Sequence, residues 1–408
     1  MVLDLKNFLR KGLPDPVNPF DGLPEFNFTG GHNSIQSFPL DDLLNSSNRV
    51  LTKYGKNLSF YYHTNGPQGD LALRNFLVQY LYSYNGMSFS DQNVIITSGS
   101  LQALDLIYNT FINAGDTVLV ESSTYGGALK RLNNIGAKYH GIKLDKDGLS
   151  CDSLIEVLEN LKKKNVKPKA LYTIPTVQNP SGTIMSLKRR QQLLKLANKY
   201  DFLIIEDDCY ADLTWNRNRP KAIFSMDTDK RVVYCGSFSK SIAPAFRVGY
   251  IVASWNIIRH ILSLKNDGGT GALEQMVLAD FCSNNFEKHL AYLVKDLKGK
   301  CDTMAYSLDA EFGSIADFVY PSGGIFIWVS FPDFINTSKL AEVCLSRGVS
   351  INPGSEWTSD PKQGKNKIRL CFANPSKNQI QEGVKKLAQI CFEEFGEPQI
   401  SHNKKRKL

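Results

Sequence analysis

The chain has 408 residues, 42% of them hydrophobic, and its formal net charge at pH 7 is +8. That length and apolar content allow a large buried core divided over two or three domains. No apolar run reaches the ~20 residues that a membrane-spanning helix needs, so the sequence excludes a transmembrane protein. The first residues reach Pro14 without the apolar region of a secretory signal. We therefore expect a cytoplasmic protein with no membrane partner.

The cysteines and basic residues give no sign of a metal site or of nucleic-acid binding. The eight cysteines are scattered, with no CxxC pair and no clustered histidines, so we expect reduced, mostly buried thiols and no metal. The stretch from Lys404 to Lys407 supplies four of the positive charges, and no basic stripe is interleaved with aromatic residues. We expect no nucleic-acid partner and interpret residues 397–408 as a disordered basic tail, with nuclear import as the open alternative.

The first part of the chain predicts an arm followed by a large α/β domain. Residues 1–45 are rich in proline, glycine and asparagine, and we interpret them as an arm that packs on a smaller domain or on a neighbouring molecule. Residues 46–290 alternate short β-branched or aliphatic runs with helical patterns, which is typical of a mostly parallel sheet between helices. The expected strands are residues 93–100, 116–123, 169–175, 202–208, 231–237 and 247–253, with helices at 101–111 and 186–200.

The chain changes character towards its C-terminal part. A long helical pattern over residues 273–312 leads to apolar runs at 323–331 and 368–374 and to a last helix that ends near Phe395. We interpret residues 291–396 as a smaller α+β domain.

The loops that follow the predicted strands carry most of the polar chemistry. They read SGSLQ, STYGG, PTVQNPSG, EDDCY and GSFSK. The carboxyl ends of parallel strands are where such sheets bind ligands. These loops together offer small residues, hydroxyls, an amide, acidic groups and one lysine. That inventory suits a ligand with a phosphate, a heteroaromatic ring and an aldehyde.

The first of these loops predicts an anion site at a helix N-terminus. Ser98, Gly99, Ser100 and Gln102 stand at a strand-to-helix junction, where backbone N–H groups attract an anion. A serine that merely caps the helix explains the same residues.

The next loops predict groups that surround a flat ring. Tyr125 stands beside two glycines and could stack on such a ring, or it could be a core tyrosine. Asn179 lies between two prolines, which fix its loop. Asp207 and Tyr210 are three residues apart, so a tight turn could bring both to one side of the ring. Metal ligation is the rival role for the acidic run Glu206 to Asp208, although no histidine stands near.

Lys240 stands in the segment CGSFSKSIAPAFRVGY, whose residues around the lysine are small, hydroxylic or apolar. Ser237 and Ser239 precede it, and Arg247 follows seven residues later. A lone amine in so uncharged a segment suits a buried nucleophile and base, since burial lowers the pKa of an amine.

These motifs, in this order, resemble the fold type I, class I aminotransferases that use pyridoxal 5'-phosphate. The motifs are SGSLQAL, ESSTYGG, PTVQNPSG, EDDCY, SFSK and the RL pair at 369–370, and the resemblance runs from Gly30 to Arg369. Within that family the chain looks most like the branch of fused regulators, kynurenine/2-aminoadipate aminotransferases and aromatic aminotransferases. The resemblance implies an α/β fold in which a mostly parallel seven-stranded sheet lies between helices, beside the smaller α+β domain.

The resemblance also implies a role for each site residue. Lys240 would bond to the cofactor, Asp207 would hold its pyridine nitrogen protonated, Tyr210 and Asn179 would hydrogen-bond its phenolate, and Tyr125 would stack on its ring. The phosphate ligands would be Ser98, Gly99, Ser100, Gln102, Ser237, Ser239 and Arg247. Arg369, with Gly31 and Asn179, would bind the substrate carboxylate. Tyr61, or Tyr62 beside it, would reach the phosphate in a neighbouring subunit, which implies a homodimer with shared sites.

The implied activity is transamination by a ping-pong mechanism, from an L-amino acid to a 2-oxo acid such as 2-oxoglutarate. The donor stays open between 2-aminoadipate, aromatic and long aliphatic amino acids, and Arg10 or Lys11 could meet a distal carboxylate. C–S lyases and related eliminating enzymes resemble the same template and form the first alternative. A non-catalytic regulator that binds the cofactor is the second, although about 45 residues before the core leave little room for a DNA-binding domain.

Overall fold

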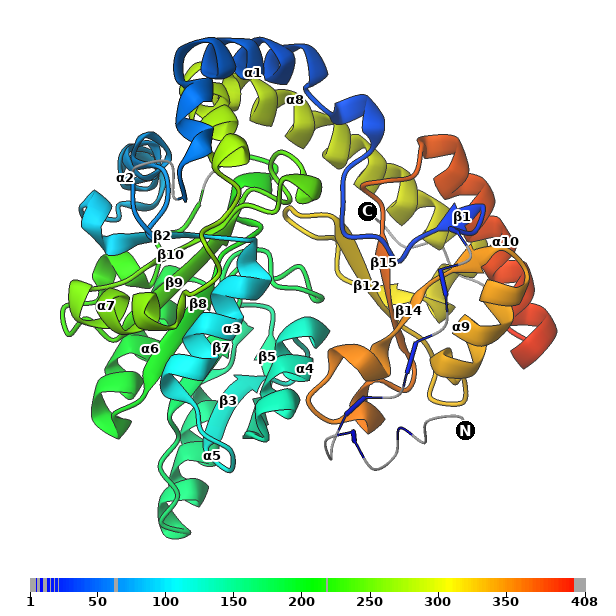
Figure 1. Ribbon diagram of the computed structural model, residues 1–408. Helices are drawn as coiled ribbons and strands as arrows, with labels where there is room; N and C mark the ends of the chain where they lie inside the picture. The colour runs from blue at the N-terminus through cyan, green and yellow to red at the C-terminus, as the bar shows by residue number, and fades with distance from the viewer. Residues whose placement is uncertain are drawn as a thin grey trace.

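The computed structural model describes residues 5, 8–9, 13–14, 16–17, 19–20, 22–61, 65–217 and 219–399. These residues form an α/β structure in which a seven-stranded sheet and a four-stranded sheet lie side by side (Figure 1). The predicted fold class is confirmed. Tyr62, Arg10, Lys11 and the basic residues 404–407 lie outside the described residues.

The larger sheet has the strand order β2-β10-β9-β8-β7-β3-β4. Its strands are β2 (Val94–Thr97), β3 (Thr117–Glu121), β4 (Lys138–Ile142), β7 (Ala170–Thr173), β8 (Leu203–Asp207), β9 (Val232–Ser237) and β10 (Gly249–Val252). All pairings are parallel except those of β10, which runs antiparallel to β2 and β9. Six of these strands were predicted from apolar runs. The runs missed β4, an edge strand with mostly solvent-accessible residues.

Helices cover both faces of this sheet because its strands are apolar on both sides. Ile95 and Ile96 point to opposite faces, and both are fully buried in different clusters. The covering helices are α2 (Leu71–Asn85), α3 (Ser100–Phe111), α4 (Gly126–Ile135), α5 (Cys151–Lys163), α6 (Leu187–Tyr200) and α7 (Trp255–Leu264). Asp70, Ser150 and Ser186 cap α2, α5 and α6 by accepting hydrogen bonds from backbone N–H groups of the first turn.

One long helix, α8 (Ala272–Phe312), joins the two halves of the molecule. It packs against α1 (Leu40–Tyr54) and α2 at one end and against α10 (Lys377–Phe395) at the other (Figure 1). The predicted division between residues 290 and 291 falls inside this helix. The boundary therefore stays a prediction, and the helix spans both of the regions that it separates.

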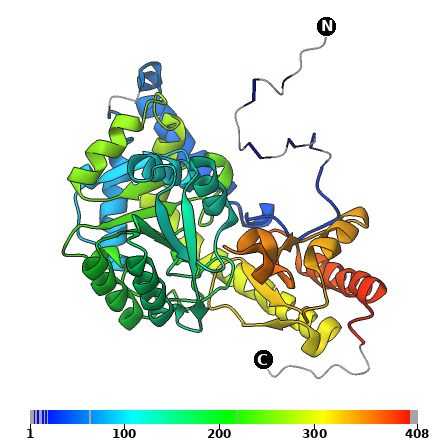
Figure 2. The same ribbon diagram turned by 90° about the horizontal axis from the view of Figure 1, so that it is seen from below.

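The smaller sheet is antiparallel and has the order β11-β12-β15-β14. Its strands are β11 (Asp317–Phe318), β12 (Phe326–Ser330), β14 (Asn352–Pro353) and β15 (Lys367–Cys371), with α9 (Thr337–Ser346) and α10 beside them. The N-terminal strand β1 (Phe26–Asn27) pairs with β13 (Val349–Ser350) in this half. Figure 2 shows the blue N-terminal part of the chain beside the orange elements of this half.

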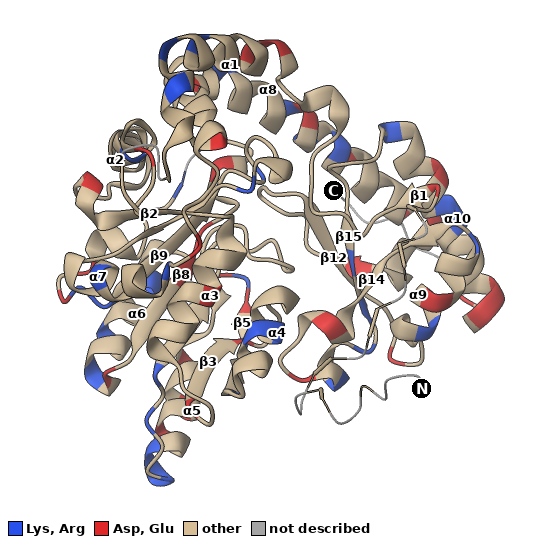
Figure 3. Ribbon diagram, viewed as in Figure 1, with Lys and Arg blue, Asp and Glu red and all other residues tan. Residues whose placement is uncertain are grey.

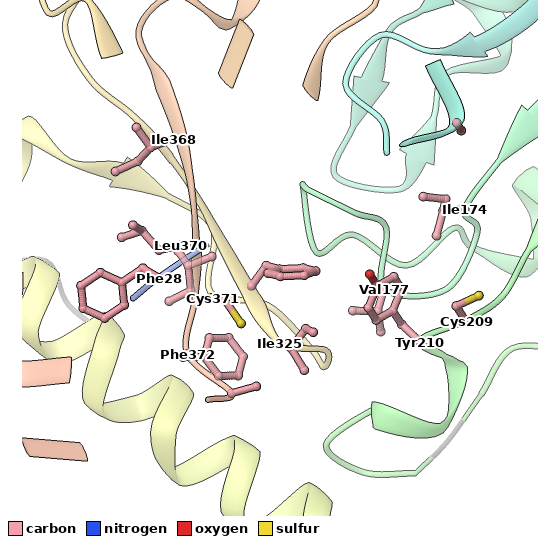
Figure 4. Close-up of a cluster of buried hydrophobic side chains, with 14 of the residues drawn as sticks. Phe28, Ile174, Val177, Cys209, Tyr210, Ile325, Ile368, Leu370, Cys371 and Phe372 are labelled. Carbon is pink, nitrogen blue, oxygen red and sulfur yellow. The ribbon is translucent and has the colours of Figure 1, made fainter. Parts of the chain in front are cut away.

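The two halves share one buried apolar cluster. It reaches from Phe28 and Leu370 beside the smaller sheet to Val177 and Tyr210 beside the larger one (Figure 4). Because these side chains pack in one continuous cluster, apolar contacts connect the two halves of the molecule.

The surface and the cysteines agree with a globular protein. All eight cysteines are buried and free. Lys and Arg are spread over the outer helices among Asp and Glu in the view of Figure 3. No helix of the described residues is long and apolar enough to cross a membrane, and those residues contain no cluster of three or more metal-ligating side chains.

Candidate active site

A cavity of about 400 Å³ lies where the carboxyl ends of the central strands of the larger sheet face the smaller sheet. This is where ligands bind in α/β sheets of this type. The predicted site residues that line it are Gly31, Ser100, Tyr125, Asn179, Asp207, Tyr210, Ser237, Ser239, Lys240, Arg247 and Arg369. Residues from both halves of the chain therefore meet in one space.

One end of the cavity is built to hold an anion. α3 begins at Ser100, so its first backbone N–H groups have no acceptor within the helix. The Arg247 guanidinium lies at the same place, with Nη2 donating to the Ser98 carbonyl oxygen at 3.3 Å. A cation beside a helix N-terminus is unfavourable until an anion lies between them. Gly99 has φ +81°, and a Cβ there would lie 2.3 Å from Arg247 Nη2.

Two predicted members of this anion site lie behind it instead. The Gln102 amide oxygen accepts from the Ser98 backbone N–H at 2.7 Å, and its nitrogen donates to Asp267 at 2.5 Å. The Ser98 hydroxyl lies 3.2 Å from that of Thr270. Neither residue lines the cavity. Their contacts instead stabilise the turn that precedes α3.

Tyr61 also lies outside the cavity. The residue is 86% exposed, and a Cβ built on Gly268 would lie 3.8 Å from its ring. At this position Tyr61 does not line the cavity of its own chain.

The acidic run at the end of β8 points in three directions. Glu206 accepts hydrogen bonds from the backbone N–H groups of Ile223 and Phe224, both at 2.8 Å. Asp208 accepts from the Tyr234 hydroxyl at 3.0 Å. Asp207 alone lines the cavity. Because the three carboxylates diverge, they do not form a common metal site.

Asp207 is a buried acid with neutral partners. Its carboxylate accepts from the Tyr172 hydroxyl at 2.7 Å and from the Cys209 backbone N–H at 3.4 Å. Burial raises its pKa, while these hydrogen bonds oppose the rise. A buried carboxylate at the cavity wall is stabilised by a protonated ring nitrogen, so this side chain fits the pyridine end of a cofactor.

The side chains around the predicted ring position form a connected set. The Asn179 amide nitrogen donates to the Tyr210 hydroxyl at 3.2 Å. Tyr125 lies at the start of α4, and its ring centroid is 5.9 Å from that of Trp357. Gly127 makes room for the Tyr125 ring, since a Cβ there would lie 2.5 Å from it.

Lys240 reaches the cavity with its amine and contacts the N-terminal segment. Its Nζ donates to the Gly31 carbonyl oxygen, and the Asn33 amide nitrogen donates to the Lys240 carbonyl at 2.8 Å. Burial lowers the pKa of the amine, and the nearby charges of Arg369 and Arg247 lower it further. This shift of the pKa is towards the neutral amine that a nucleophile or a base requires.

Arg369 closes the cavity from the smaller sheet. Its Nη2 donates to the Thr29 carbonyl oxygen at 3.0 Å and its Nη1 to the Asn179 amide oxygen at 3.4 Å. Among the residues that the structure describes it has no ion-pair partner, and burial lowers its pKa to about 10. The guanidinium stays charged at neutral pH and fits a ligand carboxylate.

Sequence reasoning missed several side chains of the same cavity. They include Thr29, Lys130, Phe326, Glu356 and Trp357. Phe326 lies in a run that was predicted to be a strand, but nothing in that run marked it as a site residue. Trp357 comes from a stretch between the predicted strands that carries no motif, so no signal in the sequence pointed to it.

The comparison with protein families decides the identity of the fold. Residues 39–387 match the family model of aminotransferase class I and II. The chain belongs to this family. It is 34% identical to an aromatic-amino-acid aminotransferase of Thermococcus litoralis over 369 residues, which cover 90% of this chain and 88% of that protein.

Two solved structures extend the likeness to the whole fold. The kynurenine aminotransferase of Pyrococcus horikoshii shares 36% identity with a TM-score of 0.85, and the match covers 91% of each chain. The α-aminoadipate aminotransferase of Thermus thermophilus, solved with N-(5'-phosphopyridoxyl)-L-leucine, shares 28% identity with a TM-score of 0.82, covering 90% of this chain and 92% of that one.

These findings make the chain a pyridoxal-phosphate-dependent transaminase. The cavity suits that cofactor on its own evidence. It combines a helix N-terminus beside Arg247, a buried Asp207 with neutral partners and an amine of lowered pKa. The prediction of the family, the fold, the cofactor and the enzyme class is confirmed.

Proposed function

We propose that the enzyme transfers the amino group of an L-amino acid to a 2-oxo acid such as 2-oxoglutarate by a ping-pong mechanism. One observation carries the proposal. A single cavity holds the amine of Lys240 and, on the opposite sheet, the buried Arg369 guanidinium without an ion-pair partner in the described residues. An α-amino acid carries a carboxylate for Arg369 and, on the same carbon, a proton within reach of a base and an amino group that can be transferred.

Each side chain then has a defined task. Arg369 and the Gly31 backbone hold the substrate carboxylate, while Arg247, Ser237, Ser239 and the start of α3 hold the cofactor phosphate. Pyridoxal phosphate, when bound, supplies a ring that takes up the negative charge left on the substrate Cα.

Proton transfer falls to the lysine and the groups around the ring. The Nζ of Lys240 would take the proton from the substrate Cα and deliver it to the cofactor carbon that receives the amino group. Asp207 keeps a proton on the ring nitrogen, and Tyr210 with Asn179 donates to the phenolate oxygen. We assign this proton transfer to Lys240, whose amine lines the cavity.

We further propose donors of the aromatic, long aliphatic or 2-aminoadipate type. The names of the similar enzymes support this range, since they include aromatic-amino-acid, kynurenine and α-aminoadipate aminotransferases. The rings of Tyr125, Phe326 and Trp357 add apolar surface to the cavity.

A homodimer with shared sites completes the proposal. Tyr61 is 86% exposed, and Ile35, Leu40, Leu44 and Phe60, which precede it in the chain, are also exposed. A second copy that covered this apolar region would bring Tyr61 towards the neighbouring cavity, as expected for the family.

The test is reconstitution followed by a panel of amino donors. Purified protein loaded with pyridoxal phosphate should be yellow and should convert at least one donor of this range with 2-oxoglutarate to glutamate. Lys240→Ala should lose the activity by about 10²-fold to 10⁴-fold or more, because it removes the acid–base group.

Two outcomes would contradict the proposal. Ammonia and pyruvate released without an acceptor would identify a lyase instead. Cofactor binding with no turnover of any donor would favour the regulatory alternative.

A further inference from the structure

The Arg369 guanidinium is held between two aromatic rings. Its central carbon lies 3.8 Å from the ring centroid of Phe326 and 3.6 Å from that of Trp357. Its Nε is buried without a hydrogen-bond acceptor. The faces of aromatic rings attract a desolvated cation, and indole does so most strongly. The cation is therefore oriented by rings and neutral oxygens, which leaves its charge available to a ligand.

The two rings come from different parts of the structure. Phe326 lies on β12, which is the strand paired with β15, so it belongs to the same sheet as Arg369. Trp357 lies outside that sheet, in residues 354–359, a segment that we call the strap. Of the two rings, only that of Trp357 can connect the guanidinium to elements outside the smaller sheet.

The strap is attached to the larger sheet. The Thr124 backbone N–H donates to the Trp357 carbonyl oxygen at 2.9 Å, and the Ser359 N–H donates to the Ser122 carbonyl oxygen at 2.8 Å. A Cβ on Gly126 would lie 2.5 Å from the Glu356 carbonyl oxygen, so only glycine allows this approach. The Trp357 ring also lies 5.9 Å from the ring of Tyr125.

We propose that Trp357 is a positioning residue for the substrate carboxylate, which rests on the proposed function of the cavity. Its indole holds the plane of the Arg369 guanidinium, and the strap ties that plane to the wall that carries Tyr125 and Lys240. Together with the hydrogen bond from Arg369 to Asn179, this contact helps to set the distance between the guanidinium and the Lys240 amine across the two sheets. A residue that only filled space would not affect carboxylate binding in a ring-dependent way.

The experiment measures carboxylate binding to the enzyme loaded with pyridoxal phosphate. The probe is 3-phenylpropanoate, which lacks an amino group and does not react, and 3-phenylpropanamide is the uncharged reference. Isothermal titration gives the dissociation constants for wild type, Trp357→Leu, Trp357→Phe and the control Trp255→Leu. Trp255 is 46% exposed and begins α7, away from the cavity.

Trp357→Leu should weaken 3-phenylpropanoate binding about tenfold more than it weakens 3-phenylpropanamide binding, since a cation–π contact to a buried guanidinium is lost. Cofactor affinity should stay unchanged. Trp357→Phe should stay within about threefold of wild type, because it keeps a ring face. In turnover, Trp357→Leu should raise KM for donor and acceptor far more than it lowers kcat. Trp255→Leu should match wild type.

Several results would overturn the assignment. These are unchanged carboxylate binding in Trp357→Leu, an equal loss in Trp357→Phe, or a wild type that does not prefer the carboxylate to the amide. If Trp357→Leu fails to fold, Gly126→Ala displaces the strap from the other side and should weaken carboxylate binding as well; unchanged binding there refutes the coupling. If the wild type binds the probe but transfers no amino group, the proposed function is wrong. The comparison of carboxylate and amide binding in the variants still tests the role of Trp357.

Discussion

The two walls of the cavity are built in different ways. On the larger sheet the polar groups stand at the ends of strands or in the loops that follow them, as Asp207, Tyr125 and Lys240 do. On the smaller sheet Arg369 stands within β15 and is desolvated between two rings. Burying a charge without a partner costs several kcal/mol, so the second wall depends on its aromatic neighbours and on the ligand. We call the first the strand-end wall, because sheet topology places its side chains, and the second the packed wall, because packing places its guanidinium.

Removing the charge of the packed wall should have the largest effect. Arg369→Gln is expected to raise KM for the amino donor about 100-fold, because losing one partner of a buried charge pair costs about 2 to 5 kcal/mol. Cofactor affinity should stay unchanged, since the phosphate end lies on the other wall. Steady-state kinetics with a cofactor titration checks both. A parallel loss of cofactor affinity would show that the walls are not separate.

Removing the Arg247 guanidinium from the strand-end wall should have a smaller effect. Arg247→Ala should weaken binding of pyridoxal phosphate about tenfold, since hydrogen bonds to a charged group contribute about 1.5 to 3 kcal/mol. At saturating cofactor the KM for the donor should stay within about twofold of wild type. Titration of the apoenzyme measures the first quantity. A raised KM at saturation would argue against the division of tasks.

The next prediction concerns Glu121, a buried carboxylate at the end of β3 in the larger sheet. Its carboxylate accepts from the Thr173 hydroxyl at 2.6 Å and the Gln178 amide at 2.9 Å. Burial raises its pKa from 4.5 to about 7. The folded chain therefore holds a proton that the unfolded chain loses between those values. Its contribution to stability is present at low pH and is lost as the pH rises through about 7.

Glu121→Gln removes that ionisation. The free energy of unfolding of wild type relative to Glu121→Gln should fall by up to about 2 kcal/mol between about pH 5.5 and about pH 8. Urea unfolding at both pH values gives the difference, in which other titrating groups cancel. A difference that is independent of pH would mean that Glu121 does not titrate in this range.

Sequence patterns located most of the strand-end wall and parts of the fold. The apolar runs marked six strands of the larger sheet because central strands buried on both faces need them. They missed β4, whose edge position leaves its side chains accessible. Gln102 stays a predicted phosphate ligand, and in the structure its side chain contacts Ser98 and Asp267. Spacing along the chain does not determine the direction in which a flexible side chain points.

The sequence by itself determined the class of the protein. The order of strand-end motifs, with Lys240 and Asp207 in register, specifies the fold, the cofactor and transamination. Only the tertiary structure decided how the substrate end is made. Trp357 and Arg369 are 12 residues apart in the chain, but their stacking depends on how the strap crosses to the larger sheet and on Phe326 from a paired strand. Contacts between separate elements are set by packing, which no local pattern of residues encodes.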